Sequence, residues 1–121
     1  MSFTIDTHGL KKLRKRLQTL AVEVHEGAEA AVTEAGEAVK DDMEARVPVD
    51  KGDLRKSLRS EVNKGNLVAE IGPRGRDVYY GYFQEFGTST TPAQPFAGPA
   101  HEAERKRFPA RMKKHVRRKI K

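Results

Sequence analysis

The side chains that could support catalysis or metal binding are few and widely separated in this 121-residue chain. There is no cysteine, so the chain has no thiolate nucleophile, thiolate zinc site or disulfide framework. Serine and histidine occur without the nucleophile-elbow motif of a hydrolase triad. The four histidines are scattered, and we expect each to be a surface imidazole rather than a metal ligand; they are His8, His25, His101 and His115.

Two further patterns also lack the features of an active site. The glycine-rich segment Gly72-Pro73-Arg74-Gly75-Arg76 does not have the lysine spacing of a phosphate-binding P-loop. The acidic residues between positions 26 and 44 are evenly spaced, as on a solvated helix face. We therefore predict that the protein is not an enzyme and has no catalytic residue, metal site or cofactor.

Charge is distributed unevenly along the chain. The formal net charge is +7 at pH 7, and 34% of the residues are charged. Residues 1–22 carry a net +4, residues 23–53 a net −7, residues 54–100 a net +2 and residues 101–121 a net +8. From Arg105 onward there are ten basic residues and no acidic one. An acidic block with a basic tail suits an acidic protein surface, nucleic acid or another copy of the chain.

Length and composition predict a single domain, 1–121, with a modest core. Only 36% of the residues are hydrophobic, so we expect partners to cover some of the apolar surface. No apolar run approaches the roughly 20 residues that span a bilayer, and the N-terminus lacks a signal-peptide core. We therefore expect a soluble protein that is made in the cytosol and does not bind membranes.

The first part of the chain, 8–46, has helical periodicity. Its apolar residues are first large and then, from position 28, mostly alanine, and an acidic face accompanies this second half. Gly27 predicts a bend between two helices, near 8–25 and 27–46, because glycine weakens a helix. Basic residues opposite the large apolar ones are expected to face solvent, although membrane or nucleic-acid binding is an alternative. The large apolar residues are Leu10, Leu13, Leu17, Leu20 and Val24.

The periodicity changes between Val47 and Leu58, where the chain reads Val-Pro-Val-Asp-Lys-Gly-Asp-Leu-Arg-Lys-Ser-Leu. The proline after Val47 ends the helical segment. Asp50 and Gly52 favour a turn, since aspartate can bond nearby backbone and glycine tolerates positive φ. The four-residue separation of Leu54 and Leu58 allows one helical turn. These residues predict a helix-to-strand corner, with a functional loop as the alternative.

Two alternating segments, 57–63 and 66–72, predict an antiparallel β-hairpin. With the loop at 64–65, Val62 would lie opposite Leu67, and all apolar side chains would share one face. A free hairpin is marginally stable in water, so this one must pack on a helix or on further strands.

Residues 77–87 contain aromatic side chains at helical spacing and end in Gly87, which suits a helix C-terminus. We predict a short helix that buries these rings against the hairpin and the other helices. An alternating strand is the competing structure, and base stacking is the competing function. The aromatic residues at helical spacing are Tyr79, Tyr82, Phe83 and Phe86.

Residues 88–98 are predicted to form an extended loop in which Pro95 and Phe96 anchor the chain to another element or subunit. A C-terminal helix is predicted over 99–119, with a proline in its first turn. Pro109 falls inside it and predicts a kink or break at the preceding residue.

These elements together predict an α+β fold. It has a long N-terminal helical segment, an antiparallel β-hairpin or small sheet, a short aromatic helix and a basic C-terminal helix. Ten apolar residues are expected to be buried: Leu13, Leu17, Leu20, Val39, Leu58, Val62, Leu67, Ile71, Phe83 and Phe86.

Three segments in this order resemble the tail-completion, or head–tail joining, proteins of long-tailed bacteriophages and prophages. They are the Val47–Leu58 segment, Tyr82-Phe-Gln-Glu-Phe-Gly-Thr and Pro95-Phe-Ala-Gly-Pro-Ala. The resemblance covers roughly residues 6–120, and each motif alone is weak. Lys51 stands where the family usually has threonine.

This resemblance implies a small, non-catalytic α/β protein that assembles as a ring in the neck, between portal and tail tube. It implies that the partners are other copies of the chain and the adjacent connector, portal-side and tail proteins. The expected location is the virion tail or neck, after synthesis in the host bacterial cytoplasm. DNA in the channel is a further candidate partner, and a nucleic-acid-binding protein that uses the basic C-terminal helix is the alternative function.

Two sets of residues are predicted to make interfaces. The first set forms a corner that presents the hairpin and the 88–98 loop to a neighbour, and its members are Asp50, Gly52, Leu54, Glu85, Gly87, Pro95 and Phe96. The second set is basic and pairs with an acidic face, like that of Glu26–Glu44, on another copy or on a neck protein. Its members are Arg111, Lys114 and Arg118.

Overall fold

The computed structural model describes residues 8–47, 52–75, 77–90 and 92–120. Its elements, in chain order, are α1 (His8–Arg46), α2 (Gly52–Ser57), β1 (Arg59–Asn63), β2 (Val68–Gly72), α3 (Asp77–Phe86) and α4 (Ala97–Lys119). The predicted α+β fold is therefore confirmed, including the short helical turn before the hairpin and the short aromatic helix.

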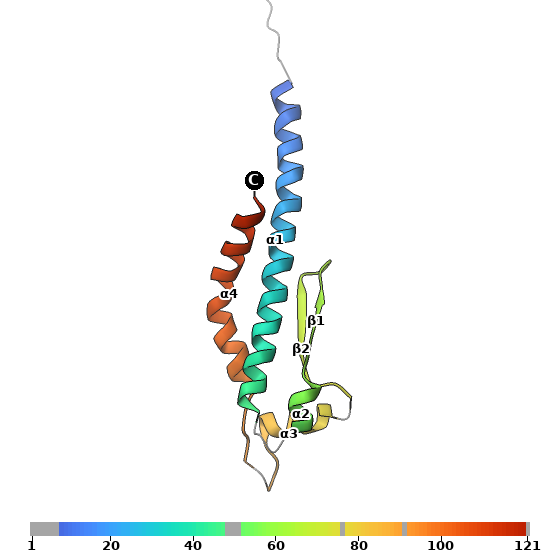
Figure 1. Ribbon diagram of the computed structural model, residues 1–121, viewed down its shortest axis with the longest axis vertical. Coiled ribbons are helices and arrows are strands. Elements are labelled where there is room, and N and C mark those ends of the chain that lie inside the picture. The colour runs from blue at the N-terminus through green and yellow to red at the C-terminus, as the bar shows by residue number, and fades with distance from the viewer. Residues whose placement is uncertain (1–7, 48–51, 76, 91, 121) are drawn as a thin grey trace, which may run out of the picture.

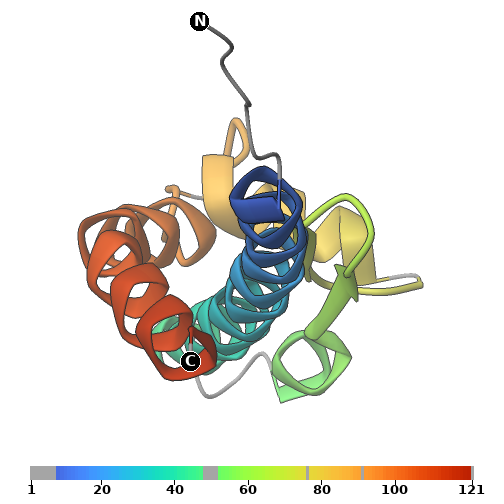
Figure 2. The same cartoon turned by 90° about the horizontal axis from the view of Figure 1, so that it is seen from above.

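Helix α1 is the long axis of the molecule (Figure 1). α4 runs antiparallel along one side of α1, the β1–β2 hairpin lies along another side, and α2 and α3 gather at the lower end (Figure 1, Figure 2). The contact between α1 and α4 is the most extensive between any two elements. The first turns of α1, beginning at His8, extend beyond the end of α4 and beyond the hairpin (Figure 1).

The predicted bend at Gly27 is wrong, because α1 is one continuous helix of 39 residues. Gly27 instead permits close approach of α4: a Cβ atom at this position would lie 2.7 Å from the Cα atom of Val116. Gly36 does the same for the hairpin, since its Cβ would lie 2.5 Å from the Ser60 Oγ atom. The two glycines thus mark where neighbouring elements contact the α1 backbone, at a cost of ~1 kcal/mol each in helix propensity.

The core lies where the second half of α1 meets α2, the hairpin and the start of α4. It contains Val39, Met43, Val47, Leu54, Leu58, Phe96 and Ala100, with Ile71 and Ala97 packed against it.

The predicted burial of Val39 and Leu58 is confirmed. Four of the other predicted core residues are half-buried, namely Leu20, Val62, Leu67 and Ile71. The prediction is wrong for Leu13, Leu17, Phe83 and Phe86, which are exposed. The two leucines precede the part of α1 that α4 and the hairpin cover, and the two phenylalanines lie on the outward face of α3.

The hairpin is antiparallel, but its register differs from the predicted one by two residues. Val62 pairs with Ala69 rather than with Leu67, and Glu61 lies opposite Glu70. The turn has four residues, Lys64 to Leu67, and Leu67 adopts a left-handed conformation with φ 57°. Because the shift is even, the apolar side chains still share one face, as expected.

Helix α4 begins at Ala97, two residues before the predicted start, so Pro99 lies in its first turn. Pro109 lies inside the helix without breaking it, which excludes the predicted break. Its side chain is exposed, so the Arg105 carbonyl that loses an N–H partner lies on the outer side of α4 and can be hydrated.

Candidate functional site

The three segments that resemble phage proteins meet at one place, which we call the motif corner. Leu54 from α2 and Phe96 at the start of α4 are each 2% exposed and belong to the same core cluster. Gly81 of α3 is buried against both, since a Cβ there would lie 3.5 Å from the Leu54 side chain and 3.6 Å from the Phe96 ring. It would also lie 2.8 Å from Pro73, so any larger residue would push α3 outward.

Glu85 holds the corner together by capping the N-terminus of α4. Its Oε2 atom accepts hydrogen bonds from the backbone N–H groups of Phe96 (2.7 Å) and Ala97 (2.9 Å), and its Oε1 atom accepts one from Gly98 (2.8 Å). The first N–H groups of a helix have no partner within the helix and carry partial positive charge. A carboxylate from α3 therefore supplies the cap that α4 lacks in its own sequence, because its N-cap residue, Phe96, makes no side-chain cap bond.

The glycine of the Pro-Phe-Ala-Gly-Pro segment has a direct role in this cap. A Cβ atom on Gly98 would lie 2.9 Å from the Glu85 Oε1 atom, which is closer than a carbon normally approaches. Gly98 therefore leaves room for the carboxylate to reach the helix N-terminus. The motif around Glu85 and the motif around Gly98 are two halves of one contact.

Burial and hydrogen bonding act in opposite directions on the pKa of the Glu85 carboxyl group. Burial raises the pKa of its carboxyl group, but the three backbone N–H donors favour the charged form and bring the pKa below its usual value of 4.5. The carboxylate is thus ionised at neutral pH, as a helix cap requires.

Other polar contacts fix the ends of the corner. Arg55 of α2 donates from Nη2 to the carbonyl of Val47 (2.8 Å), which ties α2 to the end of α1. Gly87 ends α3 with φ 79°, and its N–H donates to the Phe83 carbonyl (2.7 Å), as predicted for a helix C-terminus. Gln84 and Gln94 are joined by backbone and side-chain hydrogen bonds across the α3–α4 loop.

This arrangement turns α3 the opposite way from the prediction. Gly81 faces the core, and Gln84 and Glu85 reach the 94–98 backbone, so the aromatic side of the helix points away. The exposed side chains, which we call the aromatic patch, are Tyr79, Tyr82, Phe83 and Phe86. Within the patch the Tyr82 ring contacts Phe83 edge-to-face, with centroids 6.0 Å apart, and Phe86 at 5.0 Å.

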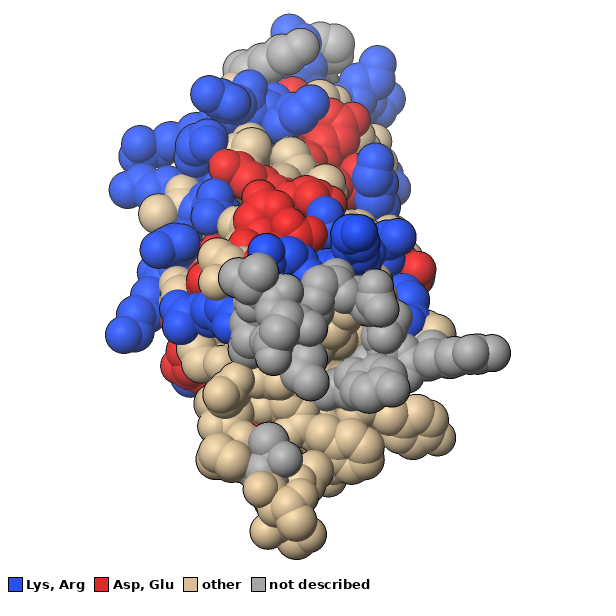
Figure 3. Space-filling model, turned by 60° about the horizontal axis from the view of Figure 1, so that its bottom comes forward, with Lys and Arg blue, Asp and Glu red and all other residues tan. Residues whose placement is uncertain are grey.

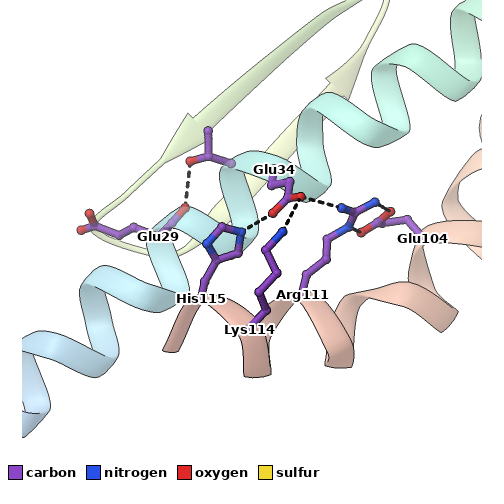
Figure 4. A network of polar contacts seen from close by, with 7 residues as sticks. Glu29, Glu34, Glu104, Arg111, Lys114 and His115 are labelled. Carbon is purple, nitrogen blue, oxygen red and sulfur yellow. Dashed lines mark hydrogen bonds and ion pairs between the residues drawn. The ribbon is translucent and has the colours of Figure 1, made fainter. Parts of the chain in front are cut away.

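A second polar cluster joins α1 to α4 (Figure 4). The Glu34 carboxylate of α1 accepts hydrogen bonds from Arg111 (3.0 Å) and Lys114 (3.4 Å) and contacts the His115 imidazole. Arg111 also donates to Glu104 two turns earlier on α4, from Nε to Oε1 (2.5 Å) and from Nη2 to Oε2 (3.1 Å). The acidic block of α1 and the basic tail of α4 therefore neutralise each other in part within one chain.

The titration of this cluster follows from its contacts. The hydrogen bond from His115 and the contacts with Lys114 outweigh burial and lower the pKa of Glu34 from 4.5 to about 2. The hydrogen bond to Glu104 is the main cause that raises the pKa of Arg111. Glu34 and Arg111 are thus both charged at neutral pH.

The structure brings only some of the predicted site residues together. Leu54, Glu85 and Phe96 share the motif corner, Gly87 ends α3 beside it, and Pro95 lies exposed in the loop before α4. Gly52 is the first residue of α2. Asp50 lies outside the described residues.

The three predicted basic interface residues also do not all lie at one contact. Arg111 and Lys114 contact Glu34 of their own chain, which supplies the acidic partner that we expected from a neighbour. Arg118 is exposed and lines a shallow groove with Glu26 and Lys119.

Sequence reasoning missed three residues of the corner. Gly81, Gly98 and Arg55 carry contacts that depend on the approach of elements distant in sequence. The signal was available for Gly81, because it lies inside the predicted 77–87 helix, where glycine is unfavourable unless space requires it. Gly98 lies in the predicted 88–98 loop, where a glycine is ordinary.

The described part of the chain has no group of three or more His, Asp or Glu residues placed to hold a metal ion. None of its helices is both long and apolar enough to span a membrane. Two of its polar clusters cap a helix and join α1 to α4. The fold and the motif corner thus define a small α+β protein in which the polar contacts described above hold its elements together.

Comparison with known families agrees with this class. Residues 11–87 match the family model described as "Bacteriophage HK97-gp10, putative tail-component". The match covers more than half of the chain, and the protein belongs to this family of phage tail components. No curated protein and no solved structure matches the chain.

Proposed function

We propose that this tail component acts at the portal side of the tail, where it completes the tail and joins it to the head as part of a ring of identical subunits. Membership in a tail-component family supports the broader role. The narrower role is supported by the three ordered segments that resemble head–tail joining proteins. Their convergence on the motif corner is the observation that carries the proposal.

The corner explains why these segments would matter to a connector. Glu85 fixes the start of α4 to α3, and Leu54 and Phe96 fix α2 against the same core. The loop between α3 and α4 and the aromatic patch are thereby presented at one end of the molecule by a rigid support. A subunit that meets neighbours on several sides needs such a support, because loose elements cost entropy on binding.

The partners in this proposal are other copies of the chain and the neighbouring connector, portal-side and tail proteins. The location is the assembled virion. Exposed apolar side chains at both ends of the molecule support a role that involves extensive protein contacts.

Deletion of the gene in a phage or prophage that encodes this chain tests the proposal. Filled heads and separate, full-length tails should accumulate, and addition of the purified protein should restore joined particles in electron micrographs. A matched control is Val68→Ser, an exposed change on the hairpin, which should restore joining as well as the wild type does. Joined particles without the protein, or tails of abnormal length, would contradict a role in joining.

Duplex DNA is the second candidate partner, since much of the basic surface of α4 points outward. Lys106, Arg107, Lys113, Arg117 and Arg118 are exposed. A binding titration with short duplex DNA at 50 and 200 mM salt distinguishes the two functions. A DNA-binding protein that contacts 6–10 phosphates loses roughly 10³–10⁵ in affinity over this range, and its Arg117→Glu variant would bind more weakly. Absence of measurable binding at 50 mM salt would exclude DNA as the main partner.

A further inference from the structure

The first half of α1 carries an apolar face that no described part of the chain covers. This face, the leucine stripe, contains Leu10, Leu13, Leu17, Leu20 and Val24. Four of its members are 40–62% exposed, and Leu20 is half-buried. The spacing continues into Gly27 and Ala31, which are buried.

The leucine stripe is uncovered because α4 is shorter than α1. α4 ends at Lys119, and its last turns contact α1 near Gly27, whereas α1 continues for about four to five further turns toward His8 (Figure 1). The stripe repeats with the three- and four-residue steps of a helix that packs against another helix or an apolar surface. It thus continues the α1–α4 seam past the point that the described part of the chain covers.

The aromatic patch on α3 is a second uncovered apolar surface, near the opposite end of α1 (Figure 1). Its four side chains are 48–74% exposed. At about 200 Å² for each ring, they expose about 500 Å². This is within the range of the largest apolar patch on a typical monomeric protein, and such a patch is often functional.

The surroundings of the two surfaces differ in charge. From Val78 to Ala100 the sequence has one charged residue, Glu85, whose carboxylate is occupied by the α4 cap. Charged groups gather on the part of the molecule formed by α1, α4 and the hairpin, and the end near α3 is largely uncharged (Figure 3). The leucine stripe, in contrast, is flanked by basic side chains at Lys12, Arg14 and Arg16, while Lys11 and Lys15 lie on the opposite side of α1.

We infer that the leucine stripe of one copy packs on the aromatic patch of a second copy. Basic flanks suit this partner, because Lys and Arg interact favourably with the faces of aromatic rings. Pairing of two leucine stripes would instead place two sets of basic side chains together. A patch of about 500 Å² that meets a stripe of comparable size buries about 1,000 Å² in total, which is near the lower limit for a biological interface.

The contact is heterologous, because each copy contributes a different surface on each side. An open chain of copies then keeps one free stripe at one end and one free patch at the other until a ring closes. This inference rests on the self-assembly included in the proposed function, and it names the two surfaces that would form the ring contact.

A pair of complementary variants tests the contact in sedimentation equilibrium, at protein concentrations up to about 1 mM. The stripe variant is Leu13→Lys with Leu17→Lys, and the patch variant is Tyr79→Lys with Phe86→Lys. Wild-type protein should self-associate, and each variant alone should do so at least about 30-fold more weakly, the effect of one interface hot spot. A 1:1 mixture should form a dimer that does not grow, since one intact stripe and one intact patch remain.

Two exposed valines provide matched controls. Val22→Lys lies on α1 five residues beyond Leu17, and therefore on another side of the helix, and Val68→Lys lies on the hairpin. Both should associate like the wild type, and circular dichroism should show unchanged helix content in all variants. If the double stripe variant loses helix, Leu10→Lys replaces it, because Leu10 lies in the first turn of α1.

Several outcomes would overturn the inference. Wild-type protein that remains monomeric at 1 mM would exclude the contact. A patch variant that still self-associates would indicate pairing of two stripes, and a stripe variant that does so would indicate pairing of two patches. If both variants assemble normally while gene deletion prevents head–tail joining, the interface is wrong and the proposed function stands. If the variants behave as expected but deletion leaves joining intact, only the proposed function fails.

Discussion

Removal of the Glu85 carboxylate should destabilise the protein more than removal of any exposed carboxylate. In Glu85→Ala the N–H groups of Phe96, Ala97 and Gly98 lose their acceptor. Phe96 is 2% exposed as a residue, so water can replace the carboxylate only in part. The variant should therefore loosen the start of α4 and the packing of α3 at the same time.

The expected loss follows from the contacts. Removal of a helix cap costs about 0.5–2 kcal/mol. An N–H group that remains buried without a partner adds about 1–3 kcal/mol. Since Gly98 is exposed and its N–H can be hydrated, we expect about 2–4 kcal/mol in total for Glu85→Ala. Glu85→Gln keeps the shape and one acceptor oxygen, so its loss should be smaller.

The free energy of unfolding from urea denaturation at pH 7 measures this effect. Glu102→Ala is the matched control, because it removes one carboxylate from an exposed position on α4 and should change stability by less than about 0.5 kcal/mol. The pKa of Glu85 is lower in the folded protein than its usual value of 4.5, so its stabilisation is complete above that pH. The difference between wild type and Glu85→Gln should therefore shrink as the pH falls below 4.5.

A loss below about 1 kcal/mol for Glu85→Ala would refute this reasoning. It would mean that water or another side chain caps α4 equally well. A difference between wild type and Glu85→Gln that stays constant from pH 7 to pH 3 would show that the charge of the carboxylate is not what stabilises the helix start.

Three further changes test other parts of the structure. Gly27→Ala should lower stability by about 1–3 kcal/mol, since its Cβ would meet the α4 backbone, whereas Gly9→Ala, with nothing within 4 Å, should raise it by up to about 1 kcal/mol. Phe96→Ala should cost about 3–5 kcal/mol and Phe86→Ala less than about 1 kcal/mol, because the first ring is buried and the second is 68% exposed; equal losses would contradict the orientation of α3. Glu34→Gln should melt at a lower temperature than the wild type at pH 6, and the gap should close as the pH falls from 4.5 to about 2, because the folded-state pKa is lowered to about 2.

The elements themselves could be predicted because their signals are local. The three- and four-residue spacing from Leu10 onward, the alternation around Val62 and the glycine after Phe86 each fix a type of structure within a few residues. The register of the hairpin could not be predicted in this way. It depends on a four-residue turn in which Leu67 adopts positive φ, a conformation that the sequence gives no reason to expect at leucine.

The orientation of α3 shows why the site was only partly predictable. Aromatic residues at helical spacing normally mark the buried face of a helix. Here Glu85 and Gln84 lie on the inward side, because backbone N–H and C=O groups at positions 94–98 need their polar atoms. The requirement comes from the start of another helix, so no local pattern around α3 contains it. The motif spacing did indicate that Glu85 and Phe96 act together, but not that one caps the other.

The leucine stripe presents the same problem on a larger scale. A periodic apolar face indicates that something covers it, and the sequence contains no sign of whether that cover belongs to the same chain. The cover of this face changes at Gly27. C-terminal to Gly27, where the side chains are small, α4 covers the face of α1. N-terminal to Gly27, where the side chains are large, α4 leaves the face exposed. Small side chains let two helices approach closely, whereas large ones keep a packed partner farther from the helix axis. The change from leucine to alanine along one continuous helix thus separates the part of α1 that serves folding from the part that we expect to serve assembly.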